Sequence, residues 1–131
     1  MSKLLILKGL PASGKSTYAK ELVNKGWKRV NKDDLRIMVD NGKWSRENEK
    51  LILDIEFKVV TQLLEKGHDV VVDDTNFAHI DMWTRCGEEW ADEYEVKFFD
   101  IPVMECVERD SKRGEKSVGA MDRDWETHIS I

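Results

Sequence analysis

The chain has 131 residues, of which 40% are hydrophobic, and a formal net charge of −5 at pH 7. This length suits one compact domain over residues 1–131 and leaves little room for a second. The apolar run at residues 4–7 is too short for a signal peptide or a membrane span, so we expect a cytoplasmic protein that does not enter a membrane.

The first predicted strand, residues 3–8, leads into the sequence GLPASGKST at residues 9–17. The strand is a near-continuous apolar run, which is typical of a central strand covered on both faces. The following residues match the phosphate-binding pattern G-x-x-x-x-G-K-[S/T], and a helix is predicted from about residue 14 to 25. We therefore predict binding of ATP or GTP by Gly9, Pro11, Ala12, Ser13, Gly14, Lys15, Ser16 and Thr17.

The chemistry of this loop follows from its residue types. Backbone N–H groups and the helix N-terminus hold phosphates, and Gly9 and Gly14 permit conformations that a Cβ would block. Lys15 adds positive charge at the β- and γ-phosphates, and the Ser16 hydroxyl can bind Mg²⁺. Motors, switches and kinases share this loop, so it predicts nucleotide binding without predicting the reaction.

The second predicted strand, residues 27–31, is followed by the sequence KDDLR at residues 32–36. If a helix begins here, Asp33 and Arg36 share a face that points into the crevice above the sheet. Asp33 is then a candidate general base for a hydroxyl acceptor, and Arg36 a candidate ligand of an anionic group on it. We interpret Asp34 as a helix-start residue favoured by the dipole. Helix capping is the alternative role for Asp33.

The longest predicted helix covers residues 46–66, with Ser45 as its N-cap and Gly67 at its end. Its apolar stripe is expected to comprise Ile52, Ile55, Val59 and Leu63. The first predicted helix is expected to bury a similar stripe of Tyr18, Ala19, Leu22 and Val23.

The third predicted strand, residues 69–72, is again a continuous apolar run, and it ends in the sequence DDTN at residues 73–76. One of the two acids is expected to organise Mg²⁺, or the groups around the acceptor, at the carboxyl edge of the sheet. The spacing alone does not choose between Asp73 and Asp74, and Asn76 is expected beside the acceptor. The alternative is that Asp74, Thr75 or Asn76 caps a helix, and both roles can hold together.

A third helix is indicated by Ile80, Trp83, Gly87 and Trp90, and a fourth strand by residues 95–101. Residues 81–95 contain six acidic residues and Arg85 as the one basic residue, so they carry the whole net charge of the chain. We interpret this stretch as the solvated face of one helix. Cys86 and Cys106 lack the spacing of metal or redox sites and are expected to be packing residues.

A fourth helix is predicted after Pro102, and it runs into the sequence RDSKRGEK at residues 109–116. These basic residues suit a small lid, at about residues 109–118, that closes over ATP with Arg109 and places Arg113 on the transferred phosphoryl group. Nearby acids balance the charges, so a solvated, salt-bridged helix is the alternative. Residues 121–129 have the spacing of a short terminal helix. The alternation of strands and helices predicts an α/β domain with a mostly parallel sheet of about four strands.

The segments GLPASGKST, NKDDLR, DDTN and FFDIPVMECVERDSKRGEKSV, in this order and at these separations, resemble the kinase half of phage-type polynucleotide 5′-kinase/3′-phosphatases. The resemblance extends over about residues 4–118. It implies a P-loop NTPase fold in which Lys15 and Ser16 serve the phosphates and the metal. It also implies that Asp33 is the general base and that Arg36 holds the acceptor's phosphate.

The resemblance further implies that Asp74 supports the acceptor site and that Arg113 is the lid arginine. The family reaction moves the γ-phosphate of ATP to the 5′-hydroxyl end of DNA or RNA. Our hypothesis is therefore an ATP- and Mg²⁺-dependent polynucleotide 5′-hydroxyl kinase. Two alternatives stay open, a kinase for a small hydroxylated molecule or nucleotide, and a nucleotide-binding module without catalysis.

Some of the family pattern is missing. We expect no phosphatase domain after the kinase region, and the tail from residue 119 carries little of the pattern, so the oligomeric state is left open. Because the surface is acidic, we expect weak, salt-sensitive binding of a strand end.

Overall fold

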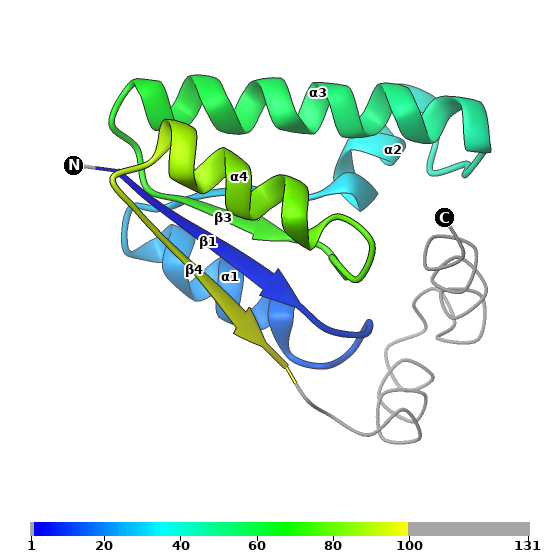
Figure 1. Cartoon of the computed structure of the whole chain (residues 1–131). Coiled ribbons are helices and arrows are strands. Elements are labelled where there is room, and N and C mark those ends of the chain that lie inside the picture. The colour runs from blue at the N-terminus through cyan, green and yellow to red at the C-terminus, as the bar shows by residue number, and fades with distance from the viewer. Residues whose placement is uncertain (1, 100–131) are drawn as a thin grey trace.

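The computed structural model describes residues 2–99 of the chain (Figure 1). The predicted fourth helix, the lid with Arg109 and Arg113, and the terminal helix lie outside the described residues. In chain order the elements are β1 (Lys3–Lys8), α1 (Lys15–Asn24), β2 (Lys28–Val30), α2 (Lys32–Asp40), α3 (Arg46–Glu65), β3 (Val70–Asp73), α4 (Ile80–Trp90) and β4 (Glu93–Phe98).

The strands form one parallel sheet in the order β2-β3-β1-β4. Helix α1 covers one face of this sheet, and α3 and α4 cover the other (Figure 1). The prediction of an α/β domain with a parallel central sheet is confirmed, and the two continuous apolar runs are its inner strands, β1 and β3. Because all strands are parallel, the residues that follow β1, β2 and β3 meet at one edge of the sheet.

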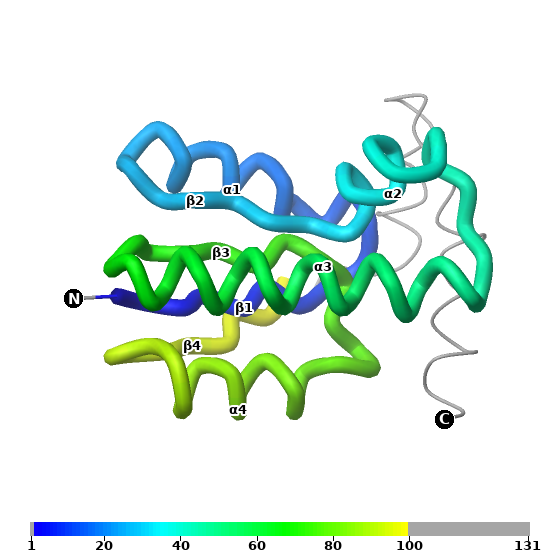
Figure 2. Tube along the Cα trace, turned by 90° about the horizontal axis from the view of Figure 1, so that it is seen from above, coloured from blue at the N-terminus to red at the C-terminus, as the bar shows by residue number. Residues whose placement is uncertain are grey.

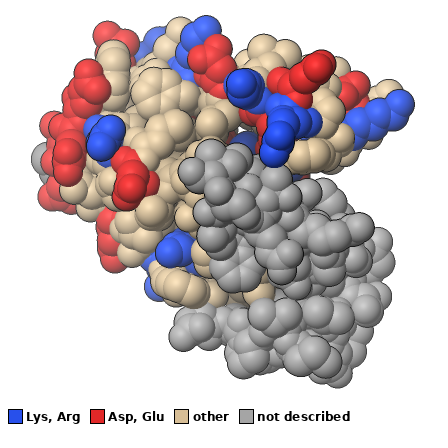
Figure 3. Space-filling view, turned by 45° about the vertical axis from the view of Figure 1, so that its right-hand side comes forward, with Lys and Arg blue, Asp and Glu red and all other residues tan. Residues whose placement is uncertain are grey.

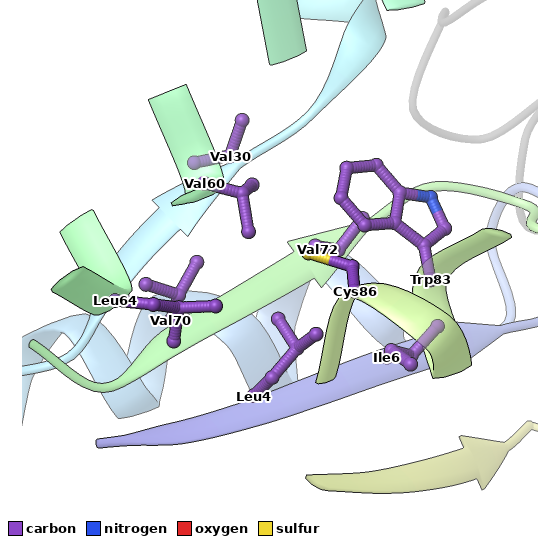
Figure 4. Packing of buried hydrophobic residues seen from close by; sticks show 9 residues of the cluster. All are labelled: Leu4, Ile6, Val30, Val60, Leu64, Val70, Val72, Trp83 and Cys86. Atoms are coloured by element: carbon purple, nitrogen blue, oxygen red, sulfur yellow. The ribbon is translucent and has the colours of Figure 1, made fainter. Parts of the chain in front are cut away.

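The core is divided between the two faces of β1. Leu4 and Ile6 pack with α3 and α4, whereas Leu5 and Leu7 face α1 with Ala19. Figure 4 shows the first of these clusters, in which Trp83 and Cys86 from α4 lie over β1 and β3. Each such fully buried apolar side chain contributes about 1.5–3 kcal/mol relative to an exposed one, so this layered core fixes the sheet edge that carries the site.

The helix ends agree with the predicted caps. The Ser45 hydroxyl accepts a hydrogen bond from the Asn48 N–H at 3.1 Å, which satisfies one free donor at the start of α3. Gly67 follows the end of α3 with φ of 86°, a left-handed conformation that favours glycine.

The buried face of α3 differs from the predicted stripe. Val59 is 38% exposed, whereas Ile52, Val60 and Leu64 are buried together with Glu56. Ile52 is buried and Leu63 packs against the core as predicted, but the assignment of Val59 was wrong, because Glu56, a charged residue type, occupies a core position on this helix. Val23 of α1, predicted to be buried, is likewise exposed at the end of its helix.

The acidic stretch at residues 81–95 does not form the face of one helix. Its acids are exposed, but they are divided between α4, the turn after it, and β4, which begins at Glu93. The interpretation was wrong because β4 begins two residues earlier than predicted. In Figure 3 acidic side chains gather along one margin of the visible face, whereas acidic and basic side chains alternate at the opposite margin. None of the helices within residues 2–99 has the length and apolar character that a membrane span requires.

Cys86 is expected to resist alkylation in the folded protein. Its side chain is buried, and burial, with a smaller effect of the Glu89 charge, raises the pKa of the thiol to about 11. Since the thiolate is the reacting species, we expect iodoacetamide at neutral pH to modify Cys86 at least about a hundredfold more slowly in the native than in the unfolded chain. Peptide mapping by mass spectrometry measures both rates, and equal rates would contradict the packing role.

Candidate functional site

The loop between β1 and α1 has the backbone of a phosphate cradle. Gly14 precedes α1 in the left-handed region with φ of 101°, and no side chain among the described residues caps this helix. A Cβ at Gly9 would lie 3.0 Å from Phe99 and from the Ser13 hydroxyl, so only glycine fits there without a shift. A helix N-terminus that no side chain caps suits an anion, and the structure agrees with the predicted nucleotide loop.

Lys15 lies against this loop. Its side chain is buried, and Nζ donates a hydrogen bond to the Leu10 carbonyl at 3.0 Å, across the loop. The Ser13 hydroxyl is also buried, and it has no hydrogen-bond partner among the described residues. A positive charge held at the loop and an unsatisfied hydroxyl inside it both fit a bound phosphate group.

The segment after β3 connects the nucleotide loop to the start of α2. On one side, the Gly9 N–H donates to the Thr75 carbonyl at 3.1 Å, and the Asn76 side-chain N–H donates to the Leu7 carbonyl at 2.6 Å. On the other side, the Lys32 N–H donates to Oδ1 of Asp74 at 2.8 Å. Two motifs far apart in the sequence are therefore joined through residues 74–76. Figure 2 shows α2 at the same end of the sheet as the loop after β1.

Of the three capping candidates after β3, the structure supports Asp74, and the helix concerned is α2. Helix α4 begins at Ile80 with His79 as its N-cap, so Asp74, Thr75 and Asn76 do not cap it. Asp74 instead accepts a hydrogen bond from the first residue of α2, where a negative charge is favoured by the helix dipole. Capping is therefore confirmed for Asp74, and the helix that it caps comes from an earlier part of the chain.

The metal role of Asp74 receives no support from this arrangement. Oδ1 accepts the Lys32 N–H, and Oδ2 is buried against Glu56. Within residues 2–99 no group of three His, Cys, Asp or Glu side chains comes together as a metal cluster. Ser16, in the first turn of α1, fits a Mg²⁺ ion that is held mainly by nucleotide phosphates and water.

The start of α2 is capped by Asn31 and not by Asp33. The Asn31 side chain accepts a hydrogen bond from the Asp34 N–H at 2.8 Å, and it donates to Oδ2 of Asp34 at 2.9 Å. Arg29 also donates to this oxygen at 3.2 Å. Capping as an alternative role for Asp33 is therefore wrong, and Asp34 is engaged at the helix start in the manner predicted.

Asp33 and Arg36 lie on one face of α2, as predicted. Nη1 of Arg36 donates to Oδ1 of Asp33 at 2.5 Å. The Asp33 side chain is 69% exposed, whereas that of Arg36 is only 8% exposed. An accessible carboxylate is thus held next to a buried, permanently charged guanidinium, which suits recognition of an anion beside a hydroxyl group.

Glu49 completes this group, although no pattern in the sequence predicts its role. Nε of Arg36 donates to Oε2 of Glu49 at 2.8 Å, and Nη2 donates to Oε1 at 2.5 Å. Lys32 also lies within 3.8 Å of the Glu49 carboxylate. A buried arginine requires such a partner, but Glu49 is thirteen residues away on α3 and no local spacing indicates it.

The charge of Arg36 is stabilised by its surroundings. Burial acts to lower the pKa of the guanidinium, but the hydrogen bond and charge of Glu49, with the charges of Asp33 and Asp74, outweigh it and raise the pKa. The bonds to Asp33 and Glu49 use three of the five N–H donors of the guanidinium. Within the described residues, donors on Nη1 and Nη2 therefore remain for an anionic group of an acceptor.

A family model described as an AAA domain matches residues 4–128. A protein of Autographa californica nuclear polyhedrosis virus, named as a bifunctional polynucleotide kinase/RNA ligase, is 31% identical across 87% of this chain. The match spans only 18% of the viral protein.

Among solved structures, a chain of the Pnkp1/Rnl/Hen1 RNA repair complex superimposes with a TM-score of 0.80 and 33% identity. The superposition covers 98% of this chain and 43% of that one. The APS kinase CysC of Mycobacterium tuberculosis, in complex with AMPPNP and APS, has a TM-score of 0.67 and 26% identity, over 85% of this chain and 69% of that one. The similarities to the viral protein and to the RNA repair complex confirm the resemblance to the kinase region of polynucleotide kinases.

Proposed function

The chain belongs to the AAA domain family whose model matches residues 4–128, and we propose that it is a kinase that transfers the γ-phosphate of ATP to the 5′-hydroxyl end of DNA or RNA. The observation that carries the proposal is the pairing of an exposed Asp33 with a buried Arg36, at the edge of the sheet that holds the nucleotide loop. The viral relative and the RNA repair complex support a nucleic-acid end as the acceptor.

In this reaction Asp33 accepts the proton of the 5′-hydroxyl while the hydroxyl oxygen bonds to the γ-phosphorus. The bond between the γ-phosphorus and the bridging oxygen breaks, and ADP leaves. Arg36 binds the phosphate that follows the terminal sugar and so orients the hydroxyl toward Asp33. The hydrogen bond from the Asn76 side chain to the Leu7 carbonyl holds residues 74–76, which border the acceptor, against the end of β1.

The charge of the transferred group is balanced at the nucleotide loop. Lys15 and the uncapped N–H groups at the start of α1 hold the phosphates, and Ser16 would hold Mg²⁺, which neutralises phosphate charge when it is bound. Arg109 and Arg113 remain predictions from the sequence, since both lie outside the described residues.

A second candidate function is phosphorylation of a smaller hydroxylated molecule or nucleotide. The APS kinase structure favours it, because its acceptor is not a polynucleotide and its fold is similar. An exposed Asp33 would serve either acceptor as a base. The two candidates differ in what Arg36 binds. The end of a nucleic-acid strand supplies the phosphate that follows the terminal sugar, whereas a small molecule need not carry a phosphate at that position.

A panel of acceptors with γ-labelled ATP distinguishes the candidates. We expect transfer to 5′-hydroxyl oligonucleotides and to a 3′-mononucleotide, and none to an oligonucleotide that already carries a 5′-phosphate. A 5′-hydroxyl nucleoside without a 3′-phosphate should be a poorer acceptor by about ten- to a hundredfold, because it lacks the charge-assisted hydrogen bonds to Arg36. Transfer to small alcohols without transfer to either nucleotide acceptor would favour the second candidate.

A further inference from the structure

Glu56 is a core residue of α3 that takes no part in the chemistry described so far. We propose that it is a positioning residue: its carboxyl group donates a hydrogen bond to Oδ2 of Asp74 and thereby holds Asp74 on the first residue of α2. The inference rests on the proposed function, since α2 carries Asp33 and Arg36.

Burial leaves Glu56 few ways to satisfy its oxygens. The side chain is 0% exposed and lies on the buried face of α3, between Ile52 and Val60. Among the described residues, no N–H or O–H group donates to either of its oxygens, and Oδ2 of Asp74 has no such donor either. These two carboxyl groups contact each other. One proton shared between them gives a partner to Oδ2 of Asp74 and to one oxygen of Glu56, whereas two facing carboxylates would repel each other.

The electrostatic surroundings favour the same arrangement. Burial, then the charge of Asp74 and the hydrogen bond with it, raise the pKa of Glu56 well above its usual range. The positive charges of Lys32 and Arg36 oppose this effect but do not cancel it. A neutral Glu56 has one O–H donor, and the unpartnered oxygen of Asp74 is the acceptor that it contacts.

The link continues from Asp74 into the site. Oδ1 of Asp74 accepts the Lys32 N–H at 2.8 Å, and Lys32 begins the helix on which Asp33 follows directly. A chain of two hydrogen bonds therefore joins the middle of α3 to the first turn of α2. If Glu56 orients the carboxylate of Asp74, loss of its donor should loosen this turn without altering the nucleotide loop.

Two substitutions separate this role from simple packing. Glu56→Gln keeps a side-chain donor and the length of the side chain, whereas Glu56→Met keeps only the length and an unbranched shape. Val60→Ala, one turn further along α3, is the matched control, because it removes buried apolar volume without touching Asp74. Hydrogen exchange of the Lys32 amide and the kcat and KM for a 5′-hydroxyl oligonucleotide are measured on each folded variant.

We expect Glu56→Met to accelerate exchange of the Lys32 amide by at least about tenfold, beyond any general rise across α3, as a lost hydrogen bond would. The kcat/KM for the oligonucleotide should fall by at least about tenfold, while the KM for ATP stays within about twofold. Glu56→Gln should remain within about threefold of wild type in both readouts, since its donor restores the bond. Val60→Ala should lower the melting temperature without a selective change at Lys32.

Unchanged Lys32 exchange in Glu56→Met would overturn the inference. So would a Glu56→Gln variant as impaired as Glu56→Met. If the Met variant does not fold, Glu56→Gln is compared with wild type alone, and exchange of the Lys32 amide at least about tenfold faster than in wild type would overturn the inference. Failure of the proposed function has a different signature. In that case the wild-type protein transfers no phosphate to the oligonucleotide, while exchange of the Lys32 amide still reports on the link between Glu56 and Asp74.

Discussion

Asp33→Asn is expected to lower the rate of phosphate transfer to a 5′-hydroxyl oligonucleotide by at least about a hundredfold, in line with loss of a general base. The amide has the shape of the carboxylate but cannot accept the hydroxyl proton. Because the Asp33 side chain is 69% exposed, the substitution should leave the fold and the affinity for ATP nearly unchanged. Single-turnover transfer from labelled ATP, with ATP affinity measured separately, gives both quantities.

Asp34→Asn is the matched control for this experiment. Asp34 is the adjacent acid, but it bonds with Asn31 and Arg29 at the start of the helix and does not bond to Arg36. We expect its transfer rate to stay within a few-fold of wild type, with any loss appearing in stability. A near-normal rate in Asp33→Asn would remove Asp33 from the role of base, and equal losses in both variants would indicate a structural effect.

Glu49→Ala is expected to lower the free energy of unfolding by about 3–5 kcal/mol, the range for breaking a buried ion pair by removing one partner. Arg36 would keep its charge at an 8% exposed position, without the two hydrogen bonds that Glu49 accepts. Its guanidinium would also lose its fixed orientation, so the KM for the acceptor should rise more than the KM for ATP. Denaturant titration and steady-state kinetics measure these effects.

The matched control is Glu47→Ala, in the same turn of α3. Glu47 is an exposed acid near the helix N-terminus, where its charge contributes only about 0.3–1 kcal/mol. A Glu49→Ala variant no less stable than Glu47→Ala would contradict the account of Arg36 as a charge held in place by Glu49.

Local signals were sufficient for the parts of the molecule that depend on neighbouring residues. The loop at residues 9–17 is recognisable because its spacing is imposed by the phosphate that it holds, and β1 and β3 are recognisable because strands covered on both faces are apolar throughout. The pairing of Asp33 with Arg36 followed from the periodicity of a helix, which the structure confirms.

Contacts between distant segments were not predictable in the same way. Glu49 reaches Arg36 from another helix, and Asp74 caps α2 from the end of β3. The apolar stripe of α3 was partly misplaced because Glu56 occupies the position of a core residue. The sequence does not show that Asp74 packs against Glu56. In each case a polar group satisfies a partner that is far away in the sequence.

The product balance of the wild-type protein is a direct test of phosphate transfer from ATP to a 5′-hydroxyl end. Unlabelled ATP and a 5′-hydroxyl oligonucleotide are incubated with the protein and Mg²⁺, and mass spectrometry quantifies the nucleotide and oligonucleotide products. We expect ADP and 5′-phosphorylated oligonucleotide in equal amounts. ADP and free phosphate with an unchanged oligonucleotide, or no consumption of ATP, would contradict it.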